Sequence, residues 1–178
     1  MTSFIGFIPT PIEQIEGFFD LVSLSVSDVV YDLGSGDGRL LFAALEKGAG
    51  KAVGVELNAE LVRQSTEAAR SRGFKNRLTF FEADVFDVKL TEASVVFCYL
   101  SIKASPALKL KFYQELRPGA KVIMEMYPIP GWKPARTANS EGKRFYLYNM
   151  PPESLREEAV RDPLIDYLNY SSSPTEES

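Results

Sequence analysis

Residues 29–39 read Val-Val-Tyr-Asp-Leu-Gly-Ser-Gly-Asp-Gly-Arg. An apolar run leads into a carboxylate, three glycines follow on alternate residues, and residues 40–45 continue as an apolar-periodic segment. This pattern predicts a buried strand, a tight turn and a helix. Glycine permits a positive φ and close approach of a ligand, and the start of a helix offers free N–H groups. The stretch therefore predicts a small-ligand site.

The spacing of the glycines distinguishes two classes of ligand. The dinucleotide fingerprint is Gly-x-Gly-x-x-Gly, whereas this chain has Gly-x-Gly-x-Gly and places Arg39 where the third dinucleotide glycine would be. Asp32 lies two residues before the first glycine, where it would repel a pyrophosphate but suits a ligand with an ammonium and a sulfonium group. The stretch looks like the cofactor-binding motif Asp-x-Gly-x-Gly-x-Gly of class I S-adenosylmethionine-dependent methyltransferases.

A second carboxylate supports this interpretation. Glu56 closes the next apolar run, residues 52–55. A nucleotide-binding α/β fold places the acid that accepts the ribose hydroxyls at this point. The alternative is that Asp32 is an ordinary helix cap and Glu56 a surface acid. Two acids in register with one glycine turn favour the binding site.

Composition limits the possible function classes. A chain of 178 residues suits one domain with a buried core. Cys98 is the single cysteine and histidine is absent, so we expect no internal disulfide, no metal site and no Ser-His-Asp or Cys-His catalysis. No apolar run reaches the length of a membrane span and the first residues lack a secretory signal, which predicts no membrane partner and a cytoplasmic protein.

Charge is unevenly distributed along the chain. Residues 153–178 contain seven acids and two bases, whereas residues 1–152 contain 17 acids and 18 bases. A nearly neutral body lacks the basic excess of a non-specific nucleic-acid binder, so nucleic acid is not an expected partner. We expect a methyltransferase domain over 1–152, with residues 1–27 as an arm and helix that cover the site. An acidic, partly disordered tail is expected over 153–178.

Hydrophobic periodicity and breaker residues predict the elements of the fold. Helices are expected over 12–22, 37–47, 59–72 and 105–116, and strands over 29–33, 51–56, 77–82, 94–100, 121–127, 133–138 and 143–149. Strands that alternate with helices and end in a hairpin indicate a Rossmann-like, doubly wound α/β fold. Its mostly parallel seven-stranded sheet would carry an antiparallel C-terminal hairpin.

Ligands of such sheets bind beyond the carboxyl ends of the strands. Asp32 can hold the amino-acid ammonium group, Glu56 the ribose hydroxyls, and Asp84 the adenine amino group while the Val85 N–H serves a ring nitrogen. The alternative for Asp84 is a turn-capping aspartate. The expected cofactor-binding residues are Thr10, Asp32, Gly34, Ser35, Gly36, Gly38, Glu56, Leu57, Asn58, Asp84 and Val85.

A narrower resemblance covers about residues 7–149. The Pro-Thr-Pro segment 9–11, the motif 31–39 and Gly131-Trp132 occur in one order, and the chain is similar to the archaeal broad-specificity and the mitochondrial protein lysine methyltransferases. The resemblance implies that the arm around Thr10 covers the cofactor and that aromatic residues line a lysine channel. Tyr99, Glu125 and Trp132 are the candidates it implies for catalysis, with Phe7 and Tyr127 beside them. The other interpretation is that these aromatics are core strand ends and a loop anchor.

The family implies S-adenosylmethionine as the methyl donor, S-adenosylhomocysteine as the product and lysine side chains of proteins as acceptors. Methyl transfer from a sulfonium depends mainly on alignment, so the absence of histidine is no obstacle. We expect a monomer or a weak oligomer. A small-molecule methyltransferase and a non-catalytic cofactor-binding module remain alternatives. Adenine and cytosine N-methyltransferases carry Asn/Asp-Pro-Pro-aromatic after the fourth strand, where this chain has Cys-Tyr-Leu-Ser at 98–101.

Overall fold

The computed structural model describes residues 12–99 and 102–152. Thr10, the arm before it and the tail 153–178 lie outside the described residues. The elements are α1 Ile12–Phe19, β1 Val29–Leu33, α2 Arg39–Glu46, β2 Lys51–Glu56, α3 Ala59–Ser71, β3 Leu78–Glu82, β4 Val95–Cys98, the short 3₁₀ helix η1 Ile102–Ala104, α4 Ser105–Glu115, β5 Lys121–Glu125, β6 Arg136–Ser140 and β7 Lys143–Asn149.

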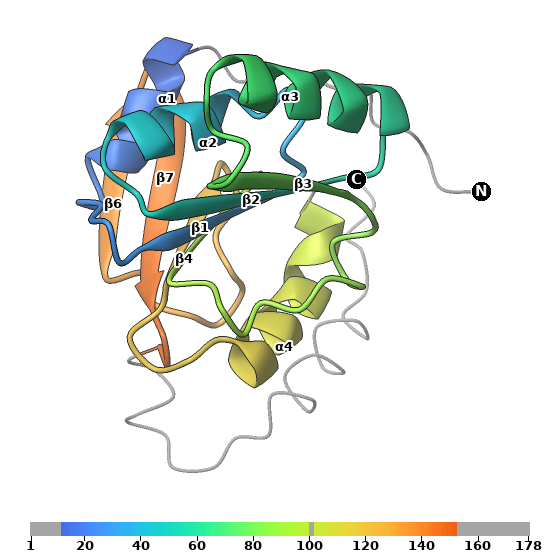
Figure 1. Ribbon diagram of the computed structural model, residues 1–178. Helices are drawn as coiled ribbons and strands as arrows, with labels where there is room; N and C mark the ends of the chain where they lie inside the picture. Colours follow the sequence, from blue (N-terminus) through green and yellow to red (C-terminus); the bar gives the residue numbers. More distant parts are fainter. Residues whose placement is uncertain (1–11, 100–101, 153–178) are drawn as a thin grey trace.

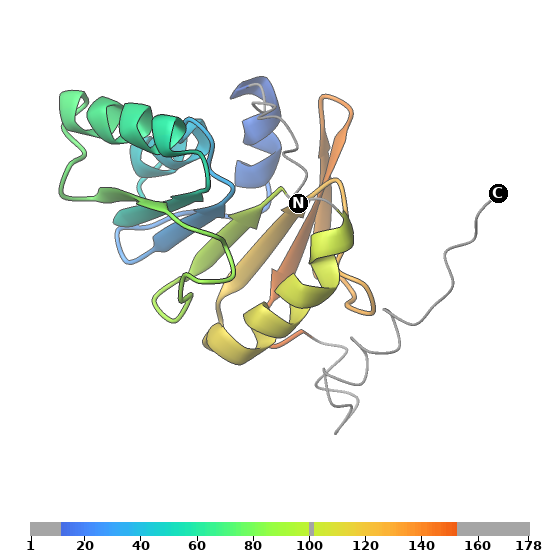
Figure 2. The ribbon, with the colours of Figure 1, turned by 90° about the vertical axis from the view of Figure 1, so that its right-hand side faces the viewer.

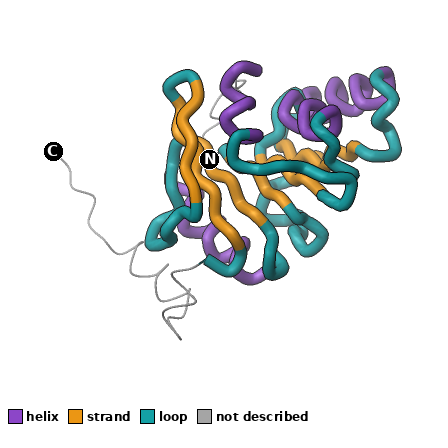
Figure 3. Tube along the Cα trace, turned by 90° about the vertical axis from the view of Figure 1, so that its left-hand side faces the viewer, coloured by secondary structure: helices purple, strands orange, loops and turns teal. Residues whose placement is uncertain are grey.

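The seven strands form one sheet in the order β3-β2-β1-β4-β5-β7-β6. Strands β1 to β5 pair in parallel, and β7 pairs antiparallel with both β5 and β6. Helices α1, α2 and α3 cover one face of this sheet and α4 covers the other (Figures 1 and 2). Viewed from the opposite side, the sheet again separates the two helical layers (Figure 3). The predicted doubly wound sheet with an antiparallel C-terminal hairpin is confirmed.

Two apolar cores hold the layers together, because successive strand residues point to opposite faces. On β4, Phe97 joins the core under α1 and α2, which includes Phe18. Its neighbour Cys98 joins the core under α4, which includes Leu108. All four residues of β4 are buried, as expected for a central parallel strand with helices on both faces.

The structure differs from the sequence prediction mainly at the ends of elements. Helix α2 begins at Arg39 because Gly38 before it has a left-handed φ of 77° and cannot be helical. Strand β5 ends at Glu125, two residues early, because Met126 has a φ of 66°. The hairpin turn is only Glu141-Gly142, with φ of 46° and 78°, the conformation of a two-residue turn that matches strand twist.

Candidate cofactor and methyl-acceptor site

The glycine turn between β1 and α2 is fastened to the end of β2. Gly34, Gly36 and Gly38 all have positive φ, at 90°, 54° and 77°. The N–H groups of Gly34 and Ser35 donate to the Val55 carbonyl at 2.9 and 3.0 Å, which holds the start of the turn against the neighbouring strand. The turn is thus shaped by its glycines and positioned by β2.

Glu56 links this turn to the start of α3. Its Oε2 accepts a hydrogen bond from the Gly36 N–H at 3.0 Å, and its Oε1 accepts one from the Asn58 N–H at 2.9 Å. A carboxylate has about four acceptor positions, so both oxygens keep the capacity to accept from a ligand hydroxyl. Asn58 itself caps α3, with Oδ1 accepting from the N–H of Glu60 and of Leu61. The structure therefore brings Gly36, Glu56 and Asn58 together.

Asp32 is a buried carboxylate among other acids. Only 4% of the residue is exposed. Burial raises the pKa of Asp32 well above its ordinary value, and the negative charges of Glu125, Glu56 and Asp37 raise it further. An acid of this kind gains strongly from a cation placed beside it, because the desolvated carboxylate then has an opposite charge nearby. The site is therefore electrostatically suited to an ammonium or sulfonium group.

Phe80 of β3 fills the space behind the glycine turn. A Cβ on Gly38 would lie 2.5 Å from Phe80 Cζ, and a Cβ on Gly54 would lie 2.7 Å from Phe80 Cε1 and 2.6 Å from Ser35 Oγ. The Ser35 hydroxyl is buried and has no hydrogen-bond partner among the described residues. The prediction of Ser35 as a cofactor ligand is therefore corrected at the side chain: its hydroxyl packs against β2, and only its backbone faces the turn.

The ends of β2 and β3 form the other end of the crevice. Leu57 and Phe86 are 64% and 43% exposed, an unusual state for large apolar side chains, and both suit contact with a flat heterocycle. Asp84 Oδ1 accepts from the Phe86 N–H at 3.0 Å, so this oxygen caps a turn, as the alternative interpretation expected. The Val85 side chain is buried on the α4 side. Phe86 was not found from the sequence, because nothing in its surroundings marks it as exposed.

Tyr99 and Glu125 lie close together at the ends of β4 and β5. Glu125 is fully buried, and its Oε1 forms an ion pair with Lys143 Nζ from the first residue of β7. The same ammonium lies 4.5 Å from the centroid of the Tyr99 ring. Sequence reasoning missed Lys143, since the antiparallel pairing that brings β7 beside β5 cannot be read from local pattern.

These groups and Asp32 are on one face of the sheet. Asp32 follows the buried Val30 by two residues and Glu125 follows Ile123 by two, and both apolar residues belong to the core under α1 and α2. Tyr99 packs against the same core. The carboxylate, the aromatic ring and the second carboxylate thus share the edge at which a doubly wound fold binds its ligands.

Trp132 lies elsewhere, and its predicted catalytic role is wrong. The side chain is 5% exposed and belongs to the core under α4, on the other face of the sheet from Tyr99 and Glu125. Its ring packs 6.0 Å from that of Tyr148. Trp132 is a loop anchor. Tyr127, its neighbour in the expected channel, follows β5, and its N–H donates to the Glu125 carbonyl.

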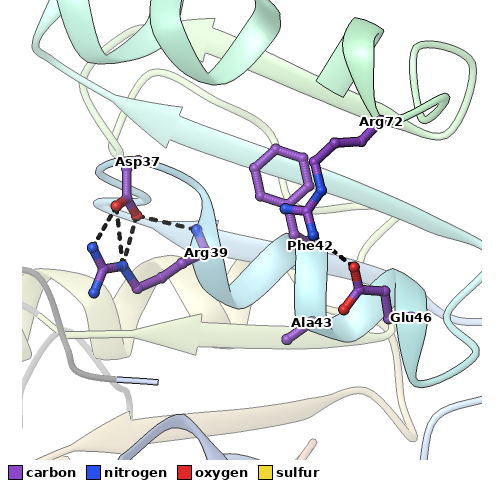
Figure 4. Close-up of a pocket in the computed structure, with 6 residues that line it drawn as sticks. All are labelled: Asp37, Arg39, Phe42, Ala43, Glu46 and Arg72. Atoms are coloured by element: carbon purple, nitrogen blue, oxygen red, sulfur yellow. Dashed lines mark hydrogen bonds and ion pairs between the residues drawn. The ribbon is translucent and has the colours of Figure 1, made fainter. Parts of the chain in front are cut away.

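A shallow pocket of about 250 Å³ opens outside the crevice, along the exposed side of α2 (Figure 4). At one end Asp37 and Arg39 pair at 2.5 Å. At the other, Arg72 lies over the Phe42 ring at 4.3 Å and pairs with Glu46 at 2.7 Å. These pairs bind protein groups to one another, so the pocket supports the outer wall of the turn.

Metal ligands and membrane-spanning segments are the two remaining features that bear on function. Within residues 12–99 and 102–152, no three histidine, cysteine or acidic side chains gather in a way that could hold a metal ion. In the same part of the chain, no helix has the length and apolar character needed to cross a membrane.

The fold and the two acids at successive strand ends define a class I S-adenosylmethionine-dependent methyltransferase. A sequence model of the ANTKMT methyltransferase domain matches residues 32–136. The chain is 34% identical to a protein-lysine N-methyltransferase of Saccharolobus islandicus over 81% of this chain and 92% of that one. It is 33% identical to a mouse lysine N-methyltransferase that is named for a component of ATP synthase, over 82% of this chain but only 58% of the mouse protein.

Among solved structures, an RNA methyltransferase from Salinibacter ruber in complex with S-adenosylhomocysteine superposes with a TM-score of 0.78. The two are 31% identical, and the match covers 87% of this chain and 98% of the other. The chain belongs to the ANTKMT methyltransferase family and is an S-adenosylmethionine-dependent methyltransferase.

The described residues fit this cofactor. Asp32 is buried without enough positive charge around it to keep its pKa low, and the sulfonium and ammonium groups supply such charge. Glu56 already orients its carboxylate through two backbone N–H groups and can accept the ribose hydroxyls. Leu57 and Phe86 present apolar surface for the adenine.

Replacing Glu56 with glutamine is expected to weaken binding of S-adenosylhomocysteine about 10- to 100-fold, measured by titration calorimetry. Glutamine keeps the shape but loses the charge, and its amide nitrogen would face one of the two backbone N–H donors; hydrogen bonds to a charged group are worth about 1.5–3 kcal/mol. Glu82→Gln is the matched control, because Glu82 is exposed and lies beside Glu56 in the β2–β3 register. Equal affinities of the two variants would contradict the role of Glu56.

Proposed function

We propose that this chain is a protein-lysine N-methyltransferase. One observation carries the proposal: beside the cofactor acid Asp32, the Glu125 carboxylate and the Tyr99 ring together hold a lysine ammonium in this structure. A carboxylate with an aromatic face is the chemistry that binds a primary ammonium group. The names of the archaeal and mouse relatives as lysine N-methyltransferases support the same acceptor.

The reaction needs a neutral amine and an aligned methyl group. The donor supplies an electrophilic methyl group on a sulfonium. The lysine nitrogen loses its proton to solvent, the N–C bond forms as the C–S bond breaks, and the bonding pair stays on sulfur. Deprotonation of an ordinary lysine at neutral pH costs about 4–5 kcal/mol. A nearby sulfonium and burial both favour the neutral amine, so bringing the lysine into this site lowers that cost.

The chain's own residues act mainly by positioning. The Tyr99 ring and the Glu125 carboxylate receive the substrate cation at the ends of β4 and β5, whereas Asp32 and Glu56 fix the donor at the ends of β1 and β2. Holding two reactants in line accounts for a large part of the rate in such a transfer.

RNA methylation is the second candidate, because the Salinibacter ruber relative is described as an RNA methyltransferase. Charge argues against it for this chain: residues 1–152 contain 17 acids and 18 bases, and phosphate contacts of RNA binders need an excess of bases. A small-molecule acceptor is the third candidate, since the Glu125–Tyr99 site would accept a free alkylamine as well as a protein lysine.

One incubation separates these candidates. The purified protein receives donor labelled in the methyl group together with a protein extract, total RNA and a metabolite pool. We expect label in protein bands that survives nuclease and that acid hydrolysis releases as methylated lysine. Label only in RNA or only in small molecules would overturn the proposal. Asp32→Asn, which should not bind the donor, is the background control.

A further inference from the structure

Lys143 occupies a position in the site that a second lysine would need. It is the first residue of β7, directly after the Glu141-Gly142 turn, and its side chain is 18% exposed. Its ammonium pairs with the fully buried carboxylate of Glu125 and lies over the Tyr99 ring. These are the two groups that the proposed function assigns to the substrate ammonium.

Two ammonium groups cannot share this space. They would repel each other at close range, where screening by water is weak, and one carboxylate would have to neutralise both. An empty place is equally unfavourable, because it would leave Glu125 buried without this cation. One cation at a time is the stable arrangement.

We propose that Lys143 is an internal stand-in for the substrate: its ammonium fills the acceptor subsite in the free enzyme, and the incoming lysine displaces it. This inference rests on the proposed function for the identity of the displacing group. The displaced Lys143 can leave because it has a long flexible side chain, borders a two-residue turn and is already partly exposed.

The position of Lys143, rather than its contacts, sets it apart. Lys47 makes the same two kinds of contact, an ion pair with Glu16 at 3.0 Å and an approach of 4.9 Å to the Phe19 ring. That pair is on the surface between α1 and α2, with Lys47 42% and Glu16 57% exposed. Lys47 is therefore a matched control for losing one lysine with a carboxylate and an aromatic partner.

The first test is kinetic. A stand-in reduces the apparent affinity for substrate by the fraction of time that it leaves the subsite open. Lys143→Met should therefore lower KM for a lysine peptide about 5- to 10-fold, with a much smaller change in kcat. Lys143→Arg, which keeps the cation, should retain the parental KM, and so should Lys47→Met. An unchanged or raised KM in Lys143→Met would overturn the inference, because it would make Lys143 a structural partner only.

The second test needs no methyl transfer. Lys143→Ala should lose thermal stability, and n-butylammonium chloride should restore several degrees of Tm by filling the vacated subsite. Neither n-butanol with Lys143→Ala nor n-butylammonium with Lys47→Ala or with the double variant Lys143→Ala/Glu125→Gln should do so. No restoration in Lys143→Ala would count against the subsite. Restoration together with labelled RNA in the acceptor experiment would keep the subsite and reject the protein substrate.

Discussion

Replacing Asp32 with asparagine should weaken binding of S-adenosylmethionine about 100-fold or more at neutral pH. The variant keeps the size of the side chain and removes its charge. In a site that is 4% exposed, a carboxylate and a cation attract each other far more strongly than in water. A 100-fold loss corresponds to about 2.7 kcal/mol, within the range for a charged hydrogen-bonded partner. Titration calorimetry with the donor measures it, and Asp20→Asn on the surface is the control.

The same substitution should make the free protein more stable. Because the pKa of Asp32 is raised on folding, the folded protein holds this proton more tightly than the unfolded chain, whose carboxyl titrates near 3.8. The stabilisation by the protonated form is complete below that value and is lost as pH rises through the raised pKa. At pH 7 asparagine avoids the buried charge, so Tm should rise by about 2–4 °C, and the gain should shrink toward pH 4.

Binding should also depend on pH through this group. A cationic donor lowers the pKa of Asp32, so binding below the raised pKa releases a proton, and affinity should increase with pH until the carboxylate is ionised in the free protein. Asp32→Asn should show none of this dependence. A variant that binds as tightly as the parent, or that loses stability at pH 7, would contradict the assignment of Asp32 as the buried cofactor acid.

Much of the fold and of the cofactor end of the site could be predicted from the sequence. Alternating apolar strands and helices are a local pattern, and the rule that parallel strands end at one edge places Asp32 and Glu56 together without any knowledge of contacts. Asn58 also shows this: its place before an amphipathic segment predicts an N-cap, and it is one. These features depend on residues close in sequence.

The acceptor end could not be predicted in this way. The contact of Glu125 with Lys143 joins two residues 18 positions apart, and it exists only because β7 returns antiparallel beside β5. Trp132 was misplaced because nothing local tells which face of the sheet a loop residue will reach. The inward turn of the Ser35 hydroxyl depends on Phe80, which belongs to another strand.

Gly38→Ala should lower the free energy of unfolding by about 3 kcal/mol or more, the largest stability loss we expect from adding one methyl group. Two terms contribute. The left-handed φ of 77° costs about 1–2 kcal/mol for alanine. The new Cβ would lie 2.5 Å from Phe80 Cζ and 2.8 Å from Cε1, and overpacking of this kind adds about 1–3 kcal/mol. Urea unfolding measures the sum.

Gly73 separates the two terms, because its φ of 79° is nearly the same and a Cβ there would meet nothing within 4 Å. Gly73→Ala should therefore cost only about 1–2 kcal/mol, the conformational term alone. The difference between the two alanine variants is the contact with Phe80, and Phe80→Leu should recover part of it when combined with Gly38→Ala, a non-additive result. Equal losses at Gly38 and Gly73 would show that the backbone alone requires glycine, and that β3 does not shape the cofactor turn.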